Sequence, residues 1–158
     1  SAALIAASKT QTGRRTKGKE QQEAAVKAAL RTLGFTEVPS RTIVNISGAP
    51  APGEFCGESK LGTRKGDIIV RLHDHRVMPI ECKVSNSSTN SVKRLNNDAA
   101  VKAQSWKTDF GLRQVVPSAM LSGVYKLHNL VDAQERGLTI FWAHDLAALT
   151  SWIASANS

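Results

Sequence analysis

Residues 66–84 read GDIIVRLHDHRVMPIECKV, two apolar stretches separated by a short polar stretch. Side chains alternate between the two faces of a β-strand, so an apolar residue at every second position indicates a buried face. Both stretches have this alternation. The apolar positions are Ile68, Val70, Leu72, Met78, Ile80 and Cys82. The segment therefore predicts a β-hairpin with one face turned toward a hydrophobic core.

The length of the hairpin loop decides which side chains lie opposite one another. A three-residue loop, 73–75, pairs Asp67 directly with Glu81 and makes the apolar faces of the two strands coincide. A four-residue loop would instead place Asp67 and Glu81 on opposite faces. The apolar alternation favours the three-residue loop. We therefore predict that Asp67 and Glu81 form an acidic pair, with Lys83 one pleat away on the same face.

Two neighbouring carboxylates repel each other unless a cation lies between them. Oxygen ligands of this kind suit Mg²⁺, which keeps part of its water shell and also binds substrate phosphate. The peptide carbonyl of Cys82, between the two charged residues, offers a further ligand. Lys83 is suited to hold or deprotonate an attacking water and to neutralise a pentavalent phosphate. The pattern predicts metal-assisted hydrolysis of a phosphodiester, with Asp67, Glu81 and Lys83 as catalytic residues.

Asp67 followed by Glu81-x-Lys83 on a hairpin, after a helix that carries an acid, resembles the PD-(D/E)xK nuclease superfamily. The resemblance extends over roughly residues 18–153. The stretches TRKGDIIVRL, MPIECKVSNSSTNSVKRLNNDAAVKAQSW and LTIFWAHDL are also similar to XamI-like type II restriction endonucleases. This resemblance implies an enzyme that cuts double-stranded DNA at a short site, often as a homodimer. Gly66 departs from the superfamily pattern, which ordinarily has proline before the first aspartate.

In that superfamily an acid on the preceding helix often completes the metal site. Two residues of this sequence compete for the role, Glu20 and Glu23. Glu23 lies at the edge of the apolar stripe formed by Val26 and Leu30, whereas Glu20 lies further round toward solvent. The resemblance therefore implies Glu23 as a further metal ligand.

The pattern of the whole chain predicts an α/β sandwich with a mixed sheet. A long loop rich in glycine and proline, residues 47–66, is expected before the hairpin. The expected helices are 18–33, 91–110, 127–136 and a last one capped by Asp145, and the expected strands outside the hairpin are 42–46, 114–124 and 138–143. With the resemblance, this becomes a restriction-endonuclease-like sandwich with a central mixed β-sheet flanked by helices.

The composition is that of one globular domain. The chain has 158 residues, 41% of them hydrophobic, and no apolar run approaches the roughly 20 residues needed to cross a bilayer. Cys56 and Cys82 cannot form a disulfide framework, and we expect both to be buried in a reducing cytoplasm. The 21 Lys+Arg and 13 Asp+Glu give a net charge of +8, which favours a polyanionic partner such as nucleic acid.

Residues 9–19, KTQTGRRTKGK, are basic and polar, so we expect a basic N-terminal arm or linker over 1–17 and the nuclease catalytic domain over 18–158. The polar stretch 85–91, SNSSTNS, is either a simple connector or a set of DNA contacts. The helix that follows it carries either a solvated face or phosphate-binding cations. The candidate DNA-binding residues are Arg14, Arg15, Arg64, Lys65, Asn86, Ser88, Lys93 and Arg94.

Three functions agree with these patterns. The first is a Mg²⁺-dependent restriction endonuclease acting on double-stranded DNA. The second is a repair or Holliday-junction-resolving nuclease of the same fold. The third is a DNA-binding module that no longer cuts, and the intact set of Asp67, Glu81 and Lys83 argues against it.

Overall fold

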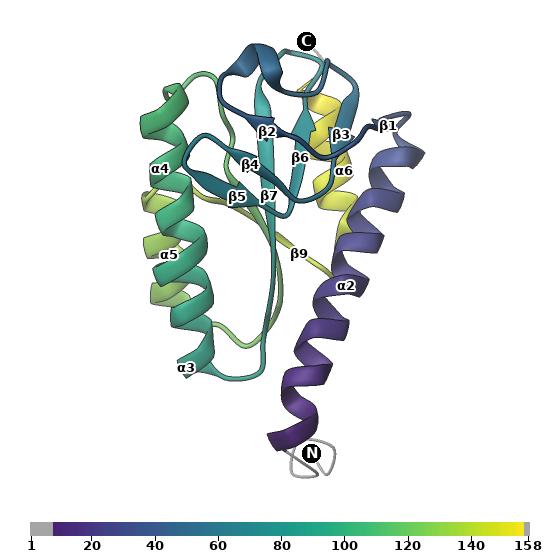
Figure 1. The fold of residues 1–158 in the computed structure, drawn as a ribbon. Helices are drawn as coiled ribbons and strands as arrows, with labels where there is room; N and C mark the ends of the chain where they lie inside the picture. The colour runs from purple at the N-terminus through teal and green to yellow at the C-terminus, as the bar shows by residue number, and fades with distance from the viewer. Residues whose placement is uncertain (1–7, 157–158) are drawn as a thin grey trace.

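The computed structural model describes the backbone of residues 8–156 and the side chains of residues 18–156. Its centre is a six-stranded sheet in the order β1-β3-β6-β7-β8-β9 (Figure 1). The strands are β1 (Thr36–Glu37), β3 (Glu54–Cys56), β6 (Ile68–Arg71), β7 (Val77–Ser85), β8 (Ser118–Gly123) and β9 (Thr139–Trp142). β6 is antiparallel to β3 and β7, whereas β7, β8 and β9 run parallel. The sheet is therefore mixed, as predicted.

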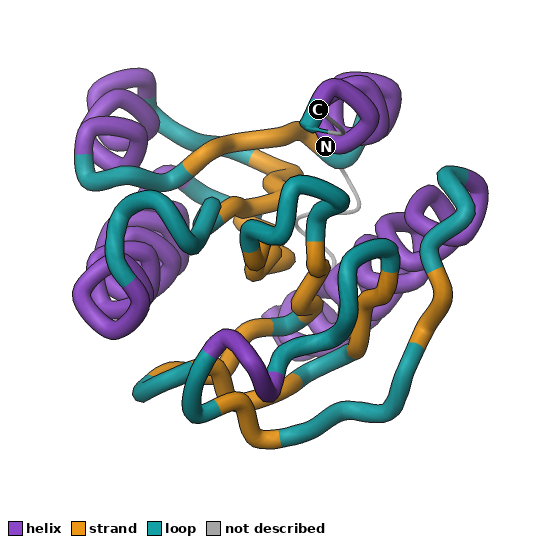
Figure 2. Tube along the Cα trace, turned by 90° about the horizontal axis from the view of Figure 1, so that it is seen from above, coloured by secondary structure: helices purple, strands orange, loops and turns teal. Residues whose placement is uncertain are grey.

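Helices cover both faces of this sheet (Figures 1 and 2). One layer contains α2 (Ser8–Thr32) and α6 (Leu146–Ser155), and the other contains α3 (Ser88–Ser91), the π-helical segment η2 (Val92–Ala99), α4 (Ala100–Phe110) and α5 (Leu127–Glu135). On the first face, Val26 and Leu30 of α2 pack with Ile80 of β7 in one hydrophobic cluster. On the second, Leu95 of η2 packs with Leu121 of β8. The fold is a three-layered α/β/α sandwich.

The hairpin between β6 and β7 has the predicted register. Ile68 pairs with Ile80 and Val70 pairs with Met78, so continuing the ladder by one residue sets position 67 opposite position 81. The Leu72 amide donates to the Arg76 carbonyl at 2.9 Å and closes a loop of residues 73–75. Its last residue, His75, has φ 77°, the left-handed conformation found at the end of three-residue hairpin loops. The three-residue loop is confirmed.

The prediction of a long loop before the hairpin is wrong. Residues 47–66 contain β3, which lies between β1 and β6 in the large sheet, and they also contribute two strands to a separate three-stranded sheet, β2-β4-β5. The bounds of this small sheet are β2 (Thr42–Ile43), β4 (Ser59–Leu61) and β5 (Arg64–Gly66). The Trp106 indole of α4 donates to the Leu61 carbonyl at 2.9 Å and anchors the small sheet. That contact joins residues far apart in the chain, so a local reading of Gly and Pro content could not foresee it.

The helix boundaries also differ from the prediction at two places. α2 begins at Ser8 rather than at residue 18, so the expected flexible arm is corrected to helix over residues 8–17. Lys, Gln and Arg favour helix, and each glycine in the interior costs only about 1 kcal/mol. The second helical segment begins at Ser88, where the Ser87 side chain accepts from the Asn90 amide as an N-cap. The boundary between arm and catalytic domain at residue 17 stays a prediction.

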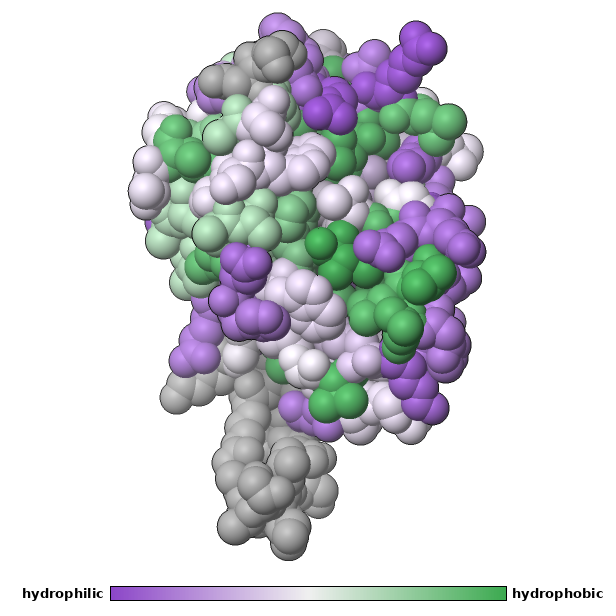
Figure 3. Space-filling view, turned by 180° about the vertical axis from the view of Figure 1, so that it is seen from behind, coloured by the Kyte–Doolittle hydropathy of each residue, from purple (hydrophilic) through white to green (hydrophobic). Residues whose placement is uncertain are grey.

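The C-terminal part follows the prediction closely. α5 and β9 lie within a residue or two of the expected bounds, and the Asp145 side chain caps α6 by accepting from the Ala148 amide. Cys56 and Cys82 are buried free thiols. None of the helices that the structure describes is both long and apolar enough to span a membrane. Seen from behind, the surface has both hydrophobic and hydrophilic areas (Figure 3), and the exposed apolar side chains include Leu127 and Val131 of α5.

Candidate active site

Two carboxylates converge where the β6–β7 hairpin opens. Asp67 Oδ2 accepts from the Cys82 amide of β7 at 2.8 Å, and Glu81 Oε2 accepts from the Asp67 amide at 3.0 Å. Each acid is therefore tied to the strand that carries the other. Both are buried. The acidic pair is held by backbone geometry rather than by flexible side chains alone.

The Glu81 side chain is fully buried, with 0% of it exposed. Burial, and after it the charge of Asp67, raises the pKa of Glu81 above its usual range. Two ammonium groups oppose that shift. Lys102 Nζ of α4 lies 2.8 Å from Glu81 Oε1, and Lys83 Nζ lies 3.6 Å from the same oxygen. The helical layer thus supplies the counter-charge that the strand needs.

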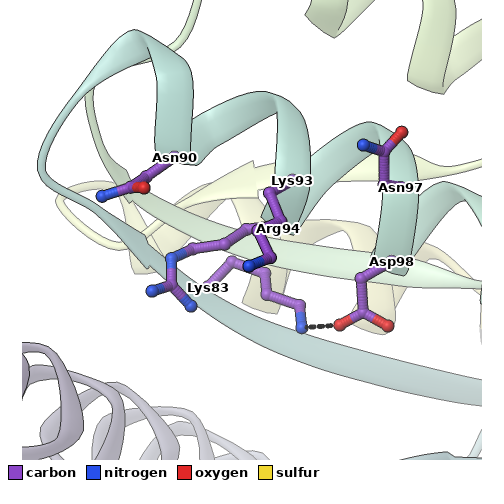
Figure 4. Close-up of a pocket in the computed structure, with 6 residues that line it drawn as sticks. All are labelled: Lys83, Asn90, Lys93, Arg94, Asn97 and Asp98. Carbon is purple, nitrogen blue, oxygen red and sulfur yellow. Dashed lines mark hydrogen bonds and ion pairs between the residues drawn. The ribbon is translucent and has the colours of Figure 1, made fainter.

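Lys83 lies on the same face as Glu81 and has a second acidic partner, Asp98 of η2 (Figure 4). Burial alone would raise the pKa of Asp98, but the hydrogen bond and charge of Lys83 lower it below its usual value. The Lys83 side chain is largely buried. Its carbonyl accepts from Gln22 of α2 at 3.2 Å, so backbone and ammonium are both fixed in place.

α2 approaches Asp67 from the other layer. Lys19 Nζ lies 3.1 Å from Asp67 Oδ1 and keeps 40% of its side chain exposed. Burial lowers the pKa of Lys19, but attraction to Asp67 outweighs it and the net shift is upward. One turn further along, Glu23 is half-buried, and burial followed by the charge of Asp67 raises its pKa. Glu20 is exposed. Of the two competing acids, Glu23 is the one whose pKa is raised by the charge of Asp67.

The donor set suits a hard cation that keeps water ligands. Ile68 and Ile80 form a ladder pair, and the peptide groups of every second residue of β7 face β6. The Cys82 carbonyl therefore points to the same edge as its amide, which Asp67 binds. Within residues 18–156, no group of three or more His, Cys, Asp or Glu side chains is arranged to hold a metal ion. Two carboxylates and a carbonyl fit Mg²⁺ better than zinc.

Lys19, Asp98 and Lys102 were missed by the sequence analysis. The local signal for these residues was the four-residue spacing of Asp98 and Lys102 in a predicted helix. In the structure, Lys102 Nζ lies 3.9 Å from Asp98 Oδ1. Nothing in that spacing says which strand the pair would face. Lys19 carried no signal, because it stands at the start of the predicted helix 18–33, where a basic side chain is ordinarily solvated.

The predicted DNA-binding residues fall in three places. Lys93 and Arg94 of η2 line a cavity of about 610 Å³ together with Lys83 (Figure 4). Ser88 is the first residue of α3, which leads into η2. Arg64 and Lys65 are exposed on β5 of the small sheet. The Asn86 side chain, between β7 and α3, is half-buried. The side chains of Arg14 and Arg15 lie outside the described residues.

Gly66, the departure from the superfamily pattern, has a steric reason. A Cβ atom at this position would lie 2.8 Å from Ile69 Cδ1 and 3.4 Å from Trp106 Cζ2. The Ile69 side chain, and more weakly the indole that anchors the small sheet, therefore crowd the space that a Cβ at position 66 would enter. The exchange does not touch Asp67.

A mixed sheet between two helical layers, with two carboxylates and a lysine converging on its central hairpin, defines a restriction-endonuclease-like α/β fold. The crystal structure of protein VC1899 from Vibrio cholerae has the same fold, with a TM-score of 0.50 and 20% sequence identity. That similarity covers 85% of this chain and 33% of the other.

The chain belongs to the XamI restriction endonuclease family, whose profile matches residues 1–142. It is 60% identical over 121 residues to the type II restriction enzyme XamI of Xanthomonas campestris pv. amaranthicola. This alignment covers 77% of the chain and 44% of the relative. The chain thus spans less than half the length of the curated relative that it matches.

Proposed function

We propose that this chain carries the Mg²⁺-dependent catalytic centre of a type II restriction endonuclease, which hydrolyses phosphodiester bonds of double-stranded DNA. The observation that supports the proposal best is the reciprocal pair of hydrogen bonds, Asp67 to the Cys82 amide and Glu81 to the Asp67 amide. It holds two acids side by side, with the Lys83 ammonium 3.6 Å from Glu81. Family membership supports the same reaction.

Asp67, Glu81 and the Cys82 carbonyl would hold the metal, with Glu23 as the fourth donor from α2. When bound, Mg²⁺ would stabilise negative charge on the phosphate and lower the pKa of a coordinated water. Such hard oxygen ligands suit Mg²⁺, which gives up its waters reluctantly.

Lys83 would orient the attacking water and stabilise the extra negative charge on the phosphate. Its ammonium is presented at a fixed position because Asp98 binds the side chain and Gln22 binds the backbone carbonyl. Lys102 would keep Glu81 ionised in spite of its burial. A positioned donor in a site of low water content stabilises developing charge more than a mobile donor does.

Several properties of the complete enzyme belong to the same proposal. We propose that it acts in the cytoplasm as a homodimer, in which each protomer cuts one strand, and that residues 18–158 form the catalytic domain. The basic residues Arg14, Arg15, Arg64 and Lys65 would contact phosphates away from the cut. The net charge of +8 supports a polyanionic substrate.

Plasmid cleavage with and without Mg²⁺ tests the proposal. Asp67→Ala and Lys83→Ala should abolish cutting yet keep most of the DNA binding measured by gel shift without metal. Glu135→Ala removes an exposed carboxylate of α5 and serves as the matched control, which should cut at the normal rate. Undiminished cutting by the Asp67 and Lys83 variants would refute the catalytic assignment.

The products of the same experiment separate the three functions. Discrete fragments from a plasmid support a restriction endonuclease. Preference for a four-way junction over linear duplex would instead indicate a junction-resolving nuclease. A gel shift without cleavage at any Mg²⁺ concentration would indicate a binding module.

A further inference from the structure

The helical rod formed by α3, η2 and α4 presents two rows of side chains. The inner row, Arg94, Asp98 and Lys102, faces β7, and its members Asp98 and Lys102 bind Lys83 and Glu81. The outer row consists of Asn90, Lys93 and Asn97. Figure 4 shows Asn97 pointing away from the bond between Lys83 and Asp98, whereas the Lys93 side chain extends toward the cavity that Lys83 lines. A π-helical segment has more residues per turn than an α-helix, so residues four apart lie on nearly the same side of η2. The two rows therefore run side by side along the helix.

The outer row stands as a ridge between two hollows. Asn90, Lys93 and Asn97 line the cavity of about 610 Å³ beside Lys83 and also line a second cavity of about 690 Å³ on the other side. The second cavity additionally carries Lys126, which precedes α5. A polar helical ridge with open, partly cationic space on both sides has the shape of an element that enters a groove of DNA.

Among residues 18–156, the side chains of this ridge have no hydrogen-bond or ion-pair partner: neither the Asn90 nor the Asn97 amide group makes a hydrogen bond, and Lys93 makes no ion pair. Asn96, next in sequence, behaves differently: its amide donates to the Asn129 carbonyl at 2.9 Å and to Asp132 at 2.8 Å. Asn96 holds the helical layer together, whereas Asn90 and Asn97 offer their hydrogen-bonding groups to solvent.

An amide group places a donor and an acceptor side by side, which matches the N7 and N6 edge of adenine in the major groove. Asn90 and Asn97 are seven residues apart, which corresponds to about 10 Å at the α-helical rise and to slightly less in the wider turns of η2. Base pairs repeat every 3.4 Å or so along each strand, and this spacing therefore spans about three base pairs. Asn97 adjoins Asp98 and hence Lys83, which places its end of the ridge nearest the proposed cut.

We propose that Asn90 and Asn97 read adenine edges in the major groove beside the scissile phosphate, while Lys93 binds the DNA backbone between them. The proposal rests on the DNA endonuclease function above and specifies how part of the sequence is recognised. Asn97 reads the A·T pair nearer the cut, and Asn90 reads one about three base pairs further away.

Cleavage and binding of a pool of randomised linear duplexes test this inference. The full chain and its Asn97→Ala, Asn90→Ala and Lys93→Ala variants are compared by sequencing the fragment ends. The duplexes bound without divalent metal are sequenced as well. Asn97→Ala should reduce discrimination at the near A·T position about ten- to a hundredfold. Asn90→Ala should do the same at the far position, and Lys93→Ala should weaken binding to all sequences and reduce its salt dependence.

Thr108→Ala, at an exposed position of α4, is the control and should leave every base preference unchanged. Alanine favours helix more than asparagine does, so the asparagine variants should fold. Unaltered base preferences in both asparagine variants, or losses at the same position in both, would overturn the inference. If the unmodified chain binds selectively but never cuts, the endonuclease proposal fails, while the binding selection still decides whether the ridge reads bases.

Discussion

The two faces of strand β7 are built from alternate residues of one short sequence, yet they serve different ends. On one face, Ile80 and Cys82 pack against Val26 of α2 in a hydrophobic cluster. On the other face, Glu81 and Lys83 bind the charged side chains of η2 and α4. One side of the strand therefore packs in the core, and the other carries the proposed catalytic side chains. Single substitutions on either side should change stability and cleavage activity separately.

The energetic balance differs between the faces. Burying an aliphatic side chain such as Leu or Ile contributes roughly 1.5–3 kcal/mol to folding. Burying a charged side chain costs several kcal/mol of folding free energy, and a well-placed ion pair recovers roughly that amount. The apolar face should therefore contribute most of the folding free energy. The charged face should contribute little net stability, even with all of its ion pairs formed.

The largest effect should come from Glu81→Gln, which removes the charge from the middle of the charged face. We expect cleavage to fall by at least about a thousandfold, comparable to the loss of a major electrostatic contribution to catalysis. The free energy of unfolding should change by only about 1 kcal/mol, because the cost of burying the charge disappears with it. Plasmid cleavage and urea denaturation measure the two quantities. A large loss of stability would show that the charged face also supports the fold.

Leu30→Ala is the opposite change on the apolar face. Leu30 is 0% exposed, so its truncation should lower the free energy of unfolding by about 3 kcal/mol through lost burial and a cavity. At a temperature where the variant remains folded, its cleavage rate should stay within about twofold of the unmodified chain. Urea denaturation and the initial cleavage rate provide the comparison, and a hundredfold slower reaction by folded protein would contradict it.

Lys102→Met should have an intermediate effect. It deprives Glu81 of the ammonium at 2.8 Å and leaves the carboxylate with the Lys83 ammonium at 3.6 Å and the Asp67 amide at 3.0 Å. Because the Lys102 side chain is 18% exposed and the methionine keeps its apolar stem, we expect a loss of about 2 kcal/mol in unfolding free energy. Lys102→Arg should restore most of it. If the arginine variant is as unstable as the methionine variant, charge compensation is not the reason.

Asp98→Asn should have the smallest effect, and it should depend on pH. The pKa of Asp98 in the folded chain lies below the usual 3.8, so its ion pair is fully present above about pH 3.8. The contribution of this ion pair to stability is lost as the pH falls through the lowered pKa that Asp98 has in the folded chain. The side chain is 42% exposed, and we expect about 1 kcal/mol or less near pH 7. Thermal denaturation of both proteins between pH 7 and pH 3 should show the difference shrinking at the acidic end. A difference that grows on acidification would refute the assignment.

The hairpin, its three-residue loop and the shared face of Asp67, Glu81 and Lys83 followed from the sequence alone. The reason is that strand periodicity and loop length are local properties, and an apolar face can match its partner in only one register. The polar N-cap and apolar stripe of the last helix were likewise visible in neighbouring residues. The catalytic roles of these residues remain a prediction of that pattern.

What completes the site came from contacts between distant parts of the chain. Lys19, Asp98 and Lys102 reach the two acids only because α2 and the η2–α4 rod pack against opposite faces of the sheet. The small sheet is tied to α4 by the hydrogen bond from Trp106 to Leu61, which joins residues far apart in the sequence. Such partners depend on how helices and strands dock, which is governed by the packing of the whole molecule and leaves no periodic signal in the segments concerned.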